Sequence, residues 1–400
     1  MDAFLYDGVR TPRGLGKARG ALAGVPPIDL LATCFRALRE RVPTSPALVS
    51  DVLLGCVTQT GEQGGNLAKI AALYGDFGES CSGVTLNRFC ASGLAALGDA
   101  ATRVASGSEA LVVAGGVESM SRVPMLSDGA AWFQNPAVAR ATGFVHMGIA
   151  ADAVATLAGL SREDLDAYAL DSHERALHAR REAWSARRLV PVLDAEGRAL
   201  LTQDEGPREG LTLEKLAAFA PIFAGQEAEL FDAVVLARRP ELGAVRHLHT
   251  VATSPSLADG AALVLVGTEA VARPLGLSPI ARIVAVSNVA TDPVTMLVGN
   301  VAAAELVLTK AGLTVSDIAR FEINESFAAV PLHFAQRLGV PRHRLNVCGG
   351  AIALGHPLGA TGIVLALTLI DELGRSGGRF GIVSICAGAG IASAVLIERL

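Results

Sequence analysis

Residues 84–97, VTLNRFCASGLAAL, place one cysteine, Cys90, between a short predicted strand and a predicted helix. The three residues after Cys90 are small, so a ligand or another part of the chain can approach the backbone closely there. A thiol at a helix N-terminus lies near the positive end of the helix dipole, which lowers the pKa of the thiol. The stretch predicts a cysteine nucleophile. A lone cysteine is more often a small apolar core residue, so this prediction depends on the rest of the chain.

The composition predicts a large buried interior. The chain has 400 residues, of which 51% are hydrophobic and 18% are charged. This length exceeds what one hydrophobic core normally serves, so two or more domains or a repeated architecture are expected. We expect part of the apolar surface to lie between subunits, in a homo-oligomer that is a dimer or a tetramer.

Several classes of partner and location are disfavoured by the sequence. The net charge is −5 and the Lys and Arg residues are scattered, so no nucleic-acid partner is expected. No apolar run approaches roughly 18 residues and the N-terminus has no apolar signal core, so we expect no membrane partner and a cytoplasmic location. The six cysteines have no C-x-x-C spacing and no histidine at metal-ligand intervals. They predict reduced thiols and no metal site.

The order of predicted elements indicates an α/β fold. Strands alternate with helices over residues 1–118, which predicts right-handed crossovers and a largely parallel sheet covered on both faces. Residues 119–246 hold both tryptophans and a charged helix, and they predict an inserted lid subdomain. The α/β pattern returns afterwards, so we expect residues 247–268 to complete the N-terminal half and residues 269–400 to form a second half. The two halves predict an internal duplication, with Leu86-Asn87 and Leu345-Asn346 in corresponding places.

Polar and glycine-rich junctions follow predicted strands, where α/β sheets bind ligands. They are residues 87–93, 324–327 (NESF), 349–362 (GGAIALGHPLGATG) and 386–390 (CAGAG). Each residue type also has a structural interpretation, in a turn, a core or a loop. Nucleotide-binding loops are disfavoured, because only seven residues follow GAGIAS and because GHPLGATG lacks the lysine of a P-loop.

Taken together, these motifs resemble one family. NRFCASGL, GGVESMSRVPM, HMG, NES-F, GGAIALGHPLGATG and a late cysteine in C-x-G-x-G occur in the order found in the thiolases, acyl-CoA C-acyltransferases that make or cleave 3-oxoacyl-CoA thioesters. The resemblance runs from residue 9 to the last strand. It implies a duplicated α-β-α-β-α layered fold with an inserted lid. It also implies acyl-CoA and coenzyme A as substrates, with no separate cofactor.

The resemblance implies a role for each catalytic residue. Cys90 would attack the thioester or 3-oxo carbonyl and form an acyl-enzyme. His356 would take the proton from Cys90, with a pKa near neutrality. Cys386 would move a proton on and off the α-carbon of the second acyl group. One oxyanion site would consist of the N–H groups of Cys90 and Gly388, and the other of His356 with a water held by Asn324.

The same resemblance places residues around the substrate. His146 and Met147 would border the acyl pocket, and Phe327 would form its wall. Cys348 stands where an asparagine usually precedes GGAIALGHP, which adds a third thiol near the site and predicts sensitivity to oxidation.

The coenzyme A segment departs from the family pattern. At the position where the family pattern has a serine near the pantetheine arm, this chain has Pro255. We expect Ser254 or Ser256 to replace that serine. Ala220 occupies the position before a proline in the lid where family members often have a basic residue. Residues 224–246 form an extension that the short-loop members of the family lack. We therefore expect rearranged coenzyme A contacts.

Four functions remain to be compared at this point. We favour degradative 3-oxoacyl-CoA thiolysis, as in fatty-acid β-oxidation, over a biosynthetic acetyl-CoA acetyltransferase that forms acetoacetyl-CoA. Ketoacyl synthases share the duplicated fold but pair their cysteine with two histidines or with His and Asn, so Cys386 discriminates against them. A non-catalytic acyl-CoA carrier would be expected to lack a catalytic residue, whereas this chain has all of them.

Overall fold

The computed structural model describes residues 2–42 and 48–400, and ten of its strands form one sheet, nine of them along a continuous path. The order along this path is β10-β11-β12-β9-β1-β8-β5-β3-β4, with β2 beside β8, and β6 and β7 form a separate pair. The strands are β1 Ala3–Arg10, β2 Gly14–Leu15, β3 Asp51–Gly55, β4 Val84–Leu86, β5 Leu111–Ser119, β6 Val192–Leu193, β7 Ala199–Leu201, β8 Ala258–Gly267, β9 Ala281–Ala290, β10 Ile318–Ile323, β11 Phe380–Cys386 and β12 Ile391–Arg399.

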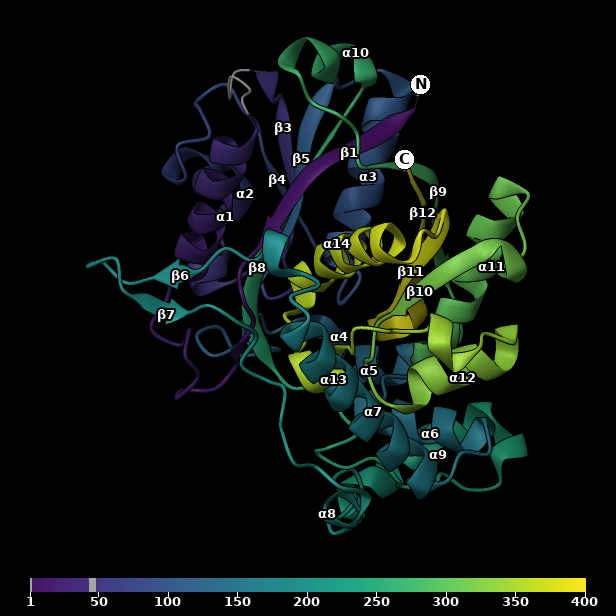
Figure 1. Ribbon diagram of the computed structural model, residues 1–400. Coiled ribbons are helices and arrows are strands. Elements are labelled where there is room, and N and C mark those ends of the chain that lie inside the picture. The colour runs from purple at the N-terminus through teal and green to yellow at the C-terminus, as the bar shows by residue number, and fades with distance from the viewer. Residues whose placement is uncertain (1, 43–47) are drawn as a thin grey trace.

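Helices cover this path and fill its centre (Figure 1). They are α1 Pro27–Arg41, α2 Leu67–Tyr74, α3 Ser92–Ser106, α4 Ala131–Gln134, α5 Pro136–Thr142, α6 Met147–Leu157, α7 Arg162–Arg181, α8 Leu213–Ala217, α9 Gln226–Arg238, α10 Glu269–Ala272, α11 Gly299–Ala311, α12 Ala329–Leu338, α13 Ala351–Leu354 and α14 Leu358–Ser376.

The elements stack in the order α-β-α-β-α. Strands β1 and β9 pair only at residues 3–5 and 281–283, so the sheet path divides there into two halves. One buried cluster joins α3 and α14 to the inner faces of both halves. Helices α1 and α2 cover the outer face of the first half, and α11 packs on the outer face of the second. The predicted layered α/β fold is confirmed.

The two halves repeat the same pairings. In the first half β3 is parallel to β4 and β5, and β8 is antiparallel to β5 and β1. In the second half β10 is parallel to β11, and β12 is antiparallel to β11 and β9. Leu345 forms a parallel bridge with β10, as Leu86 pairs with β3. Helices α3 and α14 thus occupy equivalent positions, and the two Leu-Asn pairs correspond as predicted.

The prediction of a largely parallel sheet is wrong. Parallel pairing is confined to strands joined by helical crossovers, namely β3 with β4 and β5, and β10 with β11. Strand β12 follows β11 after a tight turn, so it must run in the opposite direction. Strand β8 returns antiparallel to β5 after the long inserted segment. Periodicity identified buried strands but not the direction of their neighbours.

Glycines let α3 and α14 meet at their N-termini. A Cβ on Gly362 would lie 2.0 Å from the backbone nitrogen of Leu94, and one on Gly93 would lie 2.4 Å from the carbonyl oxygen of Gly359. Only a residue without a side chain fits such an approach. The small residues after Cys90 are therefore crowded by another part of the chain, one of the two possibilities the sequence left open.

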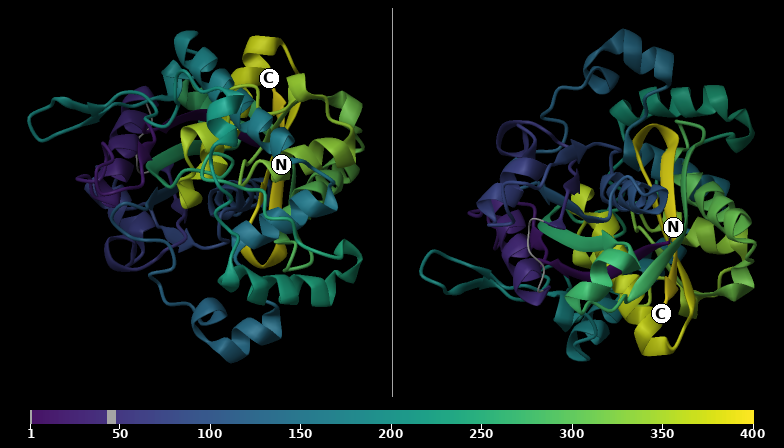
Figure 2. Two further views of the ribbon diagram at one scale, coloured as in Figure 1. Left: turned by 90° about the horizontal axis from the view of Figure 1, so that it is seen from below. Right: turned by 90° about the horizontal axis from the view of Figure 1, so that it is seen from above.

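The inserted region has a hydrophobic cluster of its own. Side chains of α6, α7 and α9 pack with Phe327 and Cys386, so this cluster reaches the ends of the second-half strands. The β6–β7 hairpin projects from the body (Figure 2). The division at residues 118 and 269 stays a prediction.

Among the described residues, no single helix has the length and apolar character needed to cross a membrane. One bent pair, Pro136–Leu157 with Arg162–Arg181, passes that test by length and composition.

Candidate active site

Cys90 lies in a tight turn between β4 and α3. Phe89, just before it, has a left-handed backbone with φ of 48°, which is uncommon for a bulky residue. The Ser92 hydroxyl accepts a hydrogen bond from the Arg88 N–H at 2.8 Å and donates one to the Phe89 carbonyl at 2.6 Å. These bonds hold the turn, and the Cys90 side chain is 4% exposed.

The thiol of Cys90 is neutral at rest. Burial raises its pKa to about 12, and the nearby Cys386 and Glu118 add to this rise, while a backbone N–H opposes it. The expectation of a lowered pKa is therefore wrong, because loss of water around the sulfur outweighs the helix terminus. A thiol in this state must lose its proton to a base before it can act as a nucleophile.

His356 is held in one orientation by a hydrogen bond at a ring nitrogen. It precedes α14, and its Nδ1 lies 2.7 Å from the Thr361 hydroxyl. That hydroxyl donates its single hydrogen to the Pro357 carbonyl at 3.0 Å, so it accepts from Nδ1–H. The proton of the neutral ring therefore sits on Nδ1, and the lone pair of Nε2 faces Asn324.

The pKa of His356 is lower than the sequence predicted. Burial, assisted by the positive charge of Arg13, lowers the pKa to about 3. The expected value near neutrality is wrong because the ring is enclosed, with 5% of the residue exposed. The imidazole is neutral at physiological pH and can accept a proton.

Asn324 and Cys386 are joined through Ser326. Asn324 Nδ2 lies 3.3 Å from His356 Nε2 and 2.8 Å from Ser326 Oγ. Ser326 Oγ lies 3.3 Å from Cys386 Sγ. Burial raises the pKa of Cys386 to about 11, and the hydrogen bond with Ser326 works against this rise. Within the described part of the chain, Asn324 Oδ1 is buried without a hydrogen-bond partner.

Gly388 lies in the turn that follows Cys386. A Cβ at this position would be 3.1 Å from the ring of Trp132 and 3.5 Å from that of Phe89, the neighbour of Cys90. The next residue, Ala389, has a left-handed φ of 58°. The turn carrying Gly388 thus lies beside the Cys90 turn.

A buried carboxylate, Glu118, connects the two halves near Cys90. It accepts hydrogen bonds from the N–H groups of Val57, Thr58 and Gly359 and from the side chain of Gln63. Because Gly359 lies in the first turn of α14, Glu118 fixes the start of that helix against the first half. The sequence contained Glu118 within GGVESMSRVPM, but gave it no role.

The predicted acyl-pocket residues lie on the lid side of the cluster. His146 caps α6 by accepting from the Gly148 N–H at 3.1 Å, and its ring lies 5.4 Å from that of Phe223. Phe223 contacts Phe327 edge to face, with centroids 5.8 Å apart. Met147 packs against both the central cluster and the lid cluster.

The segment that contains Ser254 and Ser256 runs alongside His356. The Ser256 carbonyl accepts from the His356 N–H at 2.9 Å. The Ser254 hydroxyl donates to the Thr250 carbonyl at 2.7 Å, so it is engaged within its own turn. Ser256 is half-buried beside Leu257, which forms a parallel bridge with His356.

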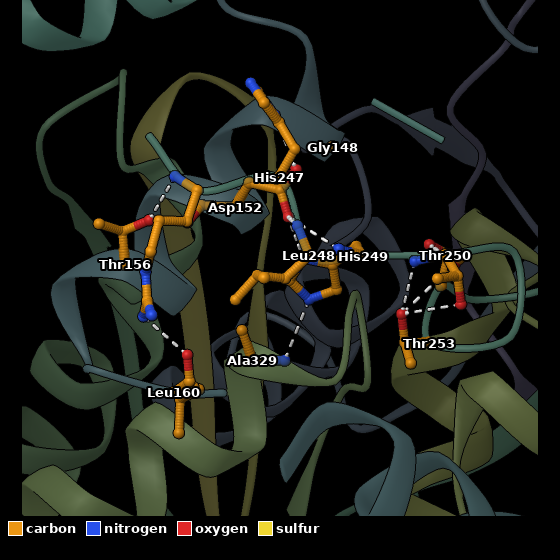
Figure 3. Close-up of polar contacts among 12 residues, drawn as sticks. Gly148, Asp152, Thr156, Leu160, His247, Leu248, His249, Thr250, Thr253 and Ala329 are labelled. Atoms are coloured by element: carbon orange, nitrogen blue, oxygen red, sulfur yellow. Dashed lines mark hydrogen bonds and ion pairs between the residues drawn. The ribbon is translucent and has the colours of Figure 1, made fainter. Parts of the chain in front are cut away.

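A network around Asp152 supports this segment (Figure 3). Asp152 lies 2.7 Å from His249 Nδ1 and 3.1 Å from His247 Nδ1. His247 also contacts Asp232 of α9 at 3.0 Å, and the Ala329 N–H donates to His249 Nε2 at 3.4 Å. Sequence reasoning missed this network, although two histidines separated by one residue, just after the predicted lid, were a visible signal.

Cys348 faces a cavity that none of the four candidate catalytic side chains lines. It lines a cavity of about 110 Å³ with Arg13, Glu322 and Glu372, and its thiol donates to Glu372 at 3.2 Å. Burial and nearby carboxylates raise its pKa well above the ordinary value. The prediction of an oxidation-sensitive thiol at the site is disfavoured, because thiolate is the reactive form.

Comparisons with known proteins agree with this geometry. The family model "Thiolase, N-terminal domain" matches residues 4–228, and "Thiolase, C-terminal domain" matches residues 277–399. The chain therefore belongs to the thiolase family, and it is an acyltransferase of that class.

Individual relatives match over almost their whole length. A steroid 3-ketoacyl-CoA thiolase of Mycobacterium tuberculosis is 36% identical, covering 100% of this chain and 94% of that protein. A β-ketoadipyl-CoA thiolase of Escherichia coli is 38% identical, with 100% of both chains covered. The crystal structure of the Bacillus anthracis acetyl-CoA acetyltransferase has a TM-score of 0.86 and 31% identity, covering 100% of this chain and 99% of that one.

Proposed function

We propose that this thiolase works in the degradative direction, cleaving 3-oxoacyl-CoA with coenzyme A into a shortened acyl-CoA and acetyl-CoA. The observation that carries the acyl-transfer chemistry, in either direction, is the arrangement around His356. Its Nδ1–H donates to the Thr361 hydroxyl, and its Nε2 lone pair faces Asn324. This arrangement suits a base that receives the Cys90 proton.

The first chemical step forms the acyl-enzyme. Cys90 attacks the 3-oxo carbonyl while its proton passes to His356 Nε2. The N–H groups of Cys90 and Gly388 would stabilise the oxyanion of one step. The buried Asn324 Oδ1, which lacks a protein partner among the described residues, suits a water that would serve the other oxyanion site with His356.

The second step uses Cys386. When the carbon–carbon bond breaks, the Cys386 thiol gives its proton to the leaving carbanion, which becomes the methyl group of acetyl-CoA. The incoming coenzyme A thiol then returns a proton to Cys386 and attacks the acyl-enzyme. Cys90 leaves as a thiolate and takes back its proton from His356 Nε2. Coenzyme A is a substrate here, and we propose no metal and no further cofactor.

The aromatic side chains of the lid favour an acyl group larger than acetyl. Trp132 lies 5.3 Å from Phe89 and 4.9 Å from Phe144, which lies 6.0 Å from Phe231. The rings of Trp132 and Phe89 stand beside Gly388, and this row of apolar rings suits a hydrophobic chain or ring. They favour degradation over the alternative, an acetyl-CoA acetyltransferase that forms acetoacetyl-CoA. We further propose a cytoplasmic homo-oligomer, a dimer or a tetramer.

Cleavage of acetoacetyl-CoA compared with 3-oxoacyl-CoAs of increasing chain length tests this proposal. We expect kcat/KM to rise with chain length. A maximum at acetoacetyl-CoA would support the acetyltransferase instead. Cys90→Ser should abolish acyl-enzyme formation, while Cys386→Ser should still be acylated by acyl-CoA but fail at carbon–carbon cleavage. An active Cys90→Ser enzyme would refute the covalent mechanism.

A further inference from the structure

The loop after β10 contains a hydroxyl group that the mechanism above does not use. Ser326 is 2% exposed and lies between Asn324 and Cys386, with its Oγ 2.8 Å from Asn324 Nδ2 and 3.3 Å from Cys386 Sγ. Both neighbours belong to the proposed catalytic set. A buried hydroxyl in this position can couple them.

The direction of the hydrogen bonds follows from His356. Its Nε2 carries no proton, so the group that faces it at 3.3 Å must be a donor, which places the amide nitrogen of Asn324 there and not its oxygen. The same nitrogen faces Ser326 and can only donate. Ser326 Oγ therefore accepts from Asn324, and its own hydrogen remains available for Cys386.

We propose that Ser326 is a positioning residue for Cys386, and that its hydroxyl donates a hydrogen bond to the Cys386 thiolate left after proton transfer to the carbanion. In that step the S–H bond of Cys386 breaks and a C–H bond forms on the leaving group. The negative charge moves from carbon to sulfur, with no change of oxidation state. In the resting enzyme the chain Thr361–His356–Asn324–Ser326–Cys386 thus aims a donor at the sulfur before any charge develops there.

Two other donors also act on Cys386, its own backbone N–H and the side chain of Asn300, and Ser326 lowers the Cys386 pKa most among the three. The titratable group that acts on it from the α3 turn is Cys90, a neutral thiol at rest. Cys386 is fully buried, so solvent does not stabilise its thiolate. A hydrogen bond to a charged acceptor contributes about 1.5–3 kcal/mol, which corresponds to roughly 10- to 150-fold in rate.

Ser326→Ala tests the inference, which rests on the proposed function. We expect acylation of Cys90 by acyl-CoA to stay within about twofold of wild type, while carbon–carbon cleavage slows by roughly 10- to 100-fold. In a Cys90→Ser background, the apparent pKa for iodoacetamide alkylation of Cys386 should rise by about one unit. Ser393→Ala is the matched control, because this buried serine bonds to Asn288 at 2.7 Å.

The outcomes separate the two proposals. Unchanged cleavage and an unchanged alkylation profile in Ser326→Ala would overturn the role of Ser326, as would an equal loss of cleavage in Ser393→Ala. A wild-type enzyme that cleaves no 3-oxoacyl-CoA would instead refute the proposed function. In that case the alkylation profile would still report whether Ser326 donates to Cys386.

Discussion

The contact between α3 and α14 makes Gly362→Ala a severe test of how the site is assembled. A Cβ at Gly362 would lie 2.0 Å from the backbone nitrogen of Leu94, whereas ordinary contact begins at 3.4 Å. The two helices must therefore separate by about 1.4 Å at this point. Helix α3 follows Cys90 and α14 follows His356, so the proposed nucleophile and its proposed base move apart.

We expect kcat to fall about 100-fold, since a displacement of about 1 Å at a reacting group costs roughly that factor. Crowding in a packed core should also lower the free energy of unfolding by about 1–3 kcal/mol. Gly374→Ala is the matched control on the same helix, because its Cβ would meet nothing within 4 Å. It should be as active as wild type and about 1 kcal/mol more stable.

The assay is coenzyme A-dependent cleavage of the 3-oxoacyl-CoA that the wild type uses best. It is run at a temperature where urea denaturation shows both variants to be folded. A folded Gly362→Ala enzyme with kcat within twofold of wild type would refute the reasoning. It would mean that the two helices separate without disturbing the site.

Three further variants test other parts of the structure. Asp204→Ala leaves two buried arginines without their carboxylate and should cost about 3–5 kcal/mol in urea denaturation; a loss below 1 kcal/mol would contradict this. Thr361→Val leaves the Nδ1–H of His356 without its acceptor and should lower kcat roughly 10- to 100-fold with the fold intact, so an unchanged kcat would contradict the tautomer. Burial raises the pKa of Glu322 well above its ordinary value, so the carboxyl binds a proton in the folded state that the unfolded state has lost. The free energy of unfolding should therefore fall as pH rises from the ordinary glutamate pKa toward the pKa of Glu322 in the folded state. Glu322→Gln should flatten the slope of this free energy against pH between pH 5 and 8. Equal slopes in the variant and the wild type would contradict the prediction.

The sequence located most catalytic candidates but not their interactions. The order of motifs placed Cys90, Asn324, His356 and Cys386 at strand ends, and the structure brings their loops together. The motifs gave no role to Ser326, although this residue stands within NESF. A hydroxyl becomes informative only when its neighbours in space are known, because its single hydrogen is assigned by what surrounds it.

Both pKa predictions for the central pair were wrong for one physical reason. A thiol at a helix start and an imidazole beside a glycine were assessed from local chemistry alone. Their pKa values depend on how much water the rest of the fold removes, and residues from both halves of the chain enclose them.

The sequence by itself determined the layered α/β fold, its duplication and the family, because these follow from periodicity and from motifs that are local in the chain. Tertiary structure alone decided strand direction, the tautomer of His356, the protonation of Cys90 and the hydrogen-bond chain to Cys386. The hydrogen-bond chain joins residues that are 32 and 60 positions apart in the sequence. The tautomer depends on how the Thr361 hydroxyl is bonded, and the protonation of Cys90 depends on the solvent that packing excludes. In VTLNRFCASGLAAL, the small residues are now explained by the close approach of α14 to α3.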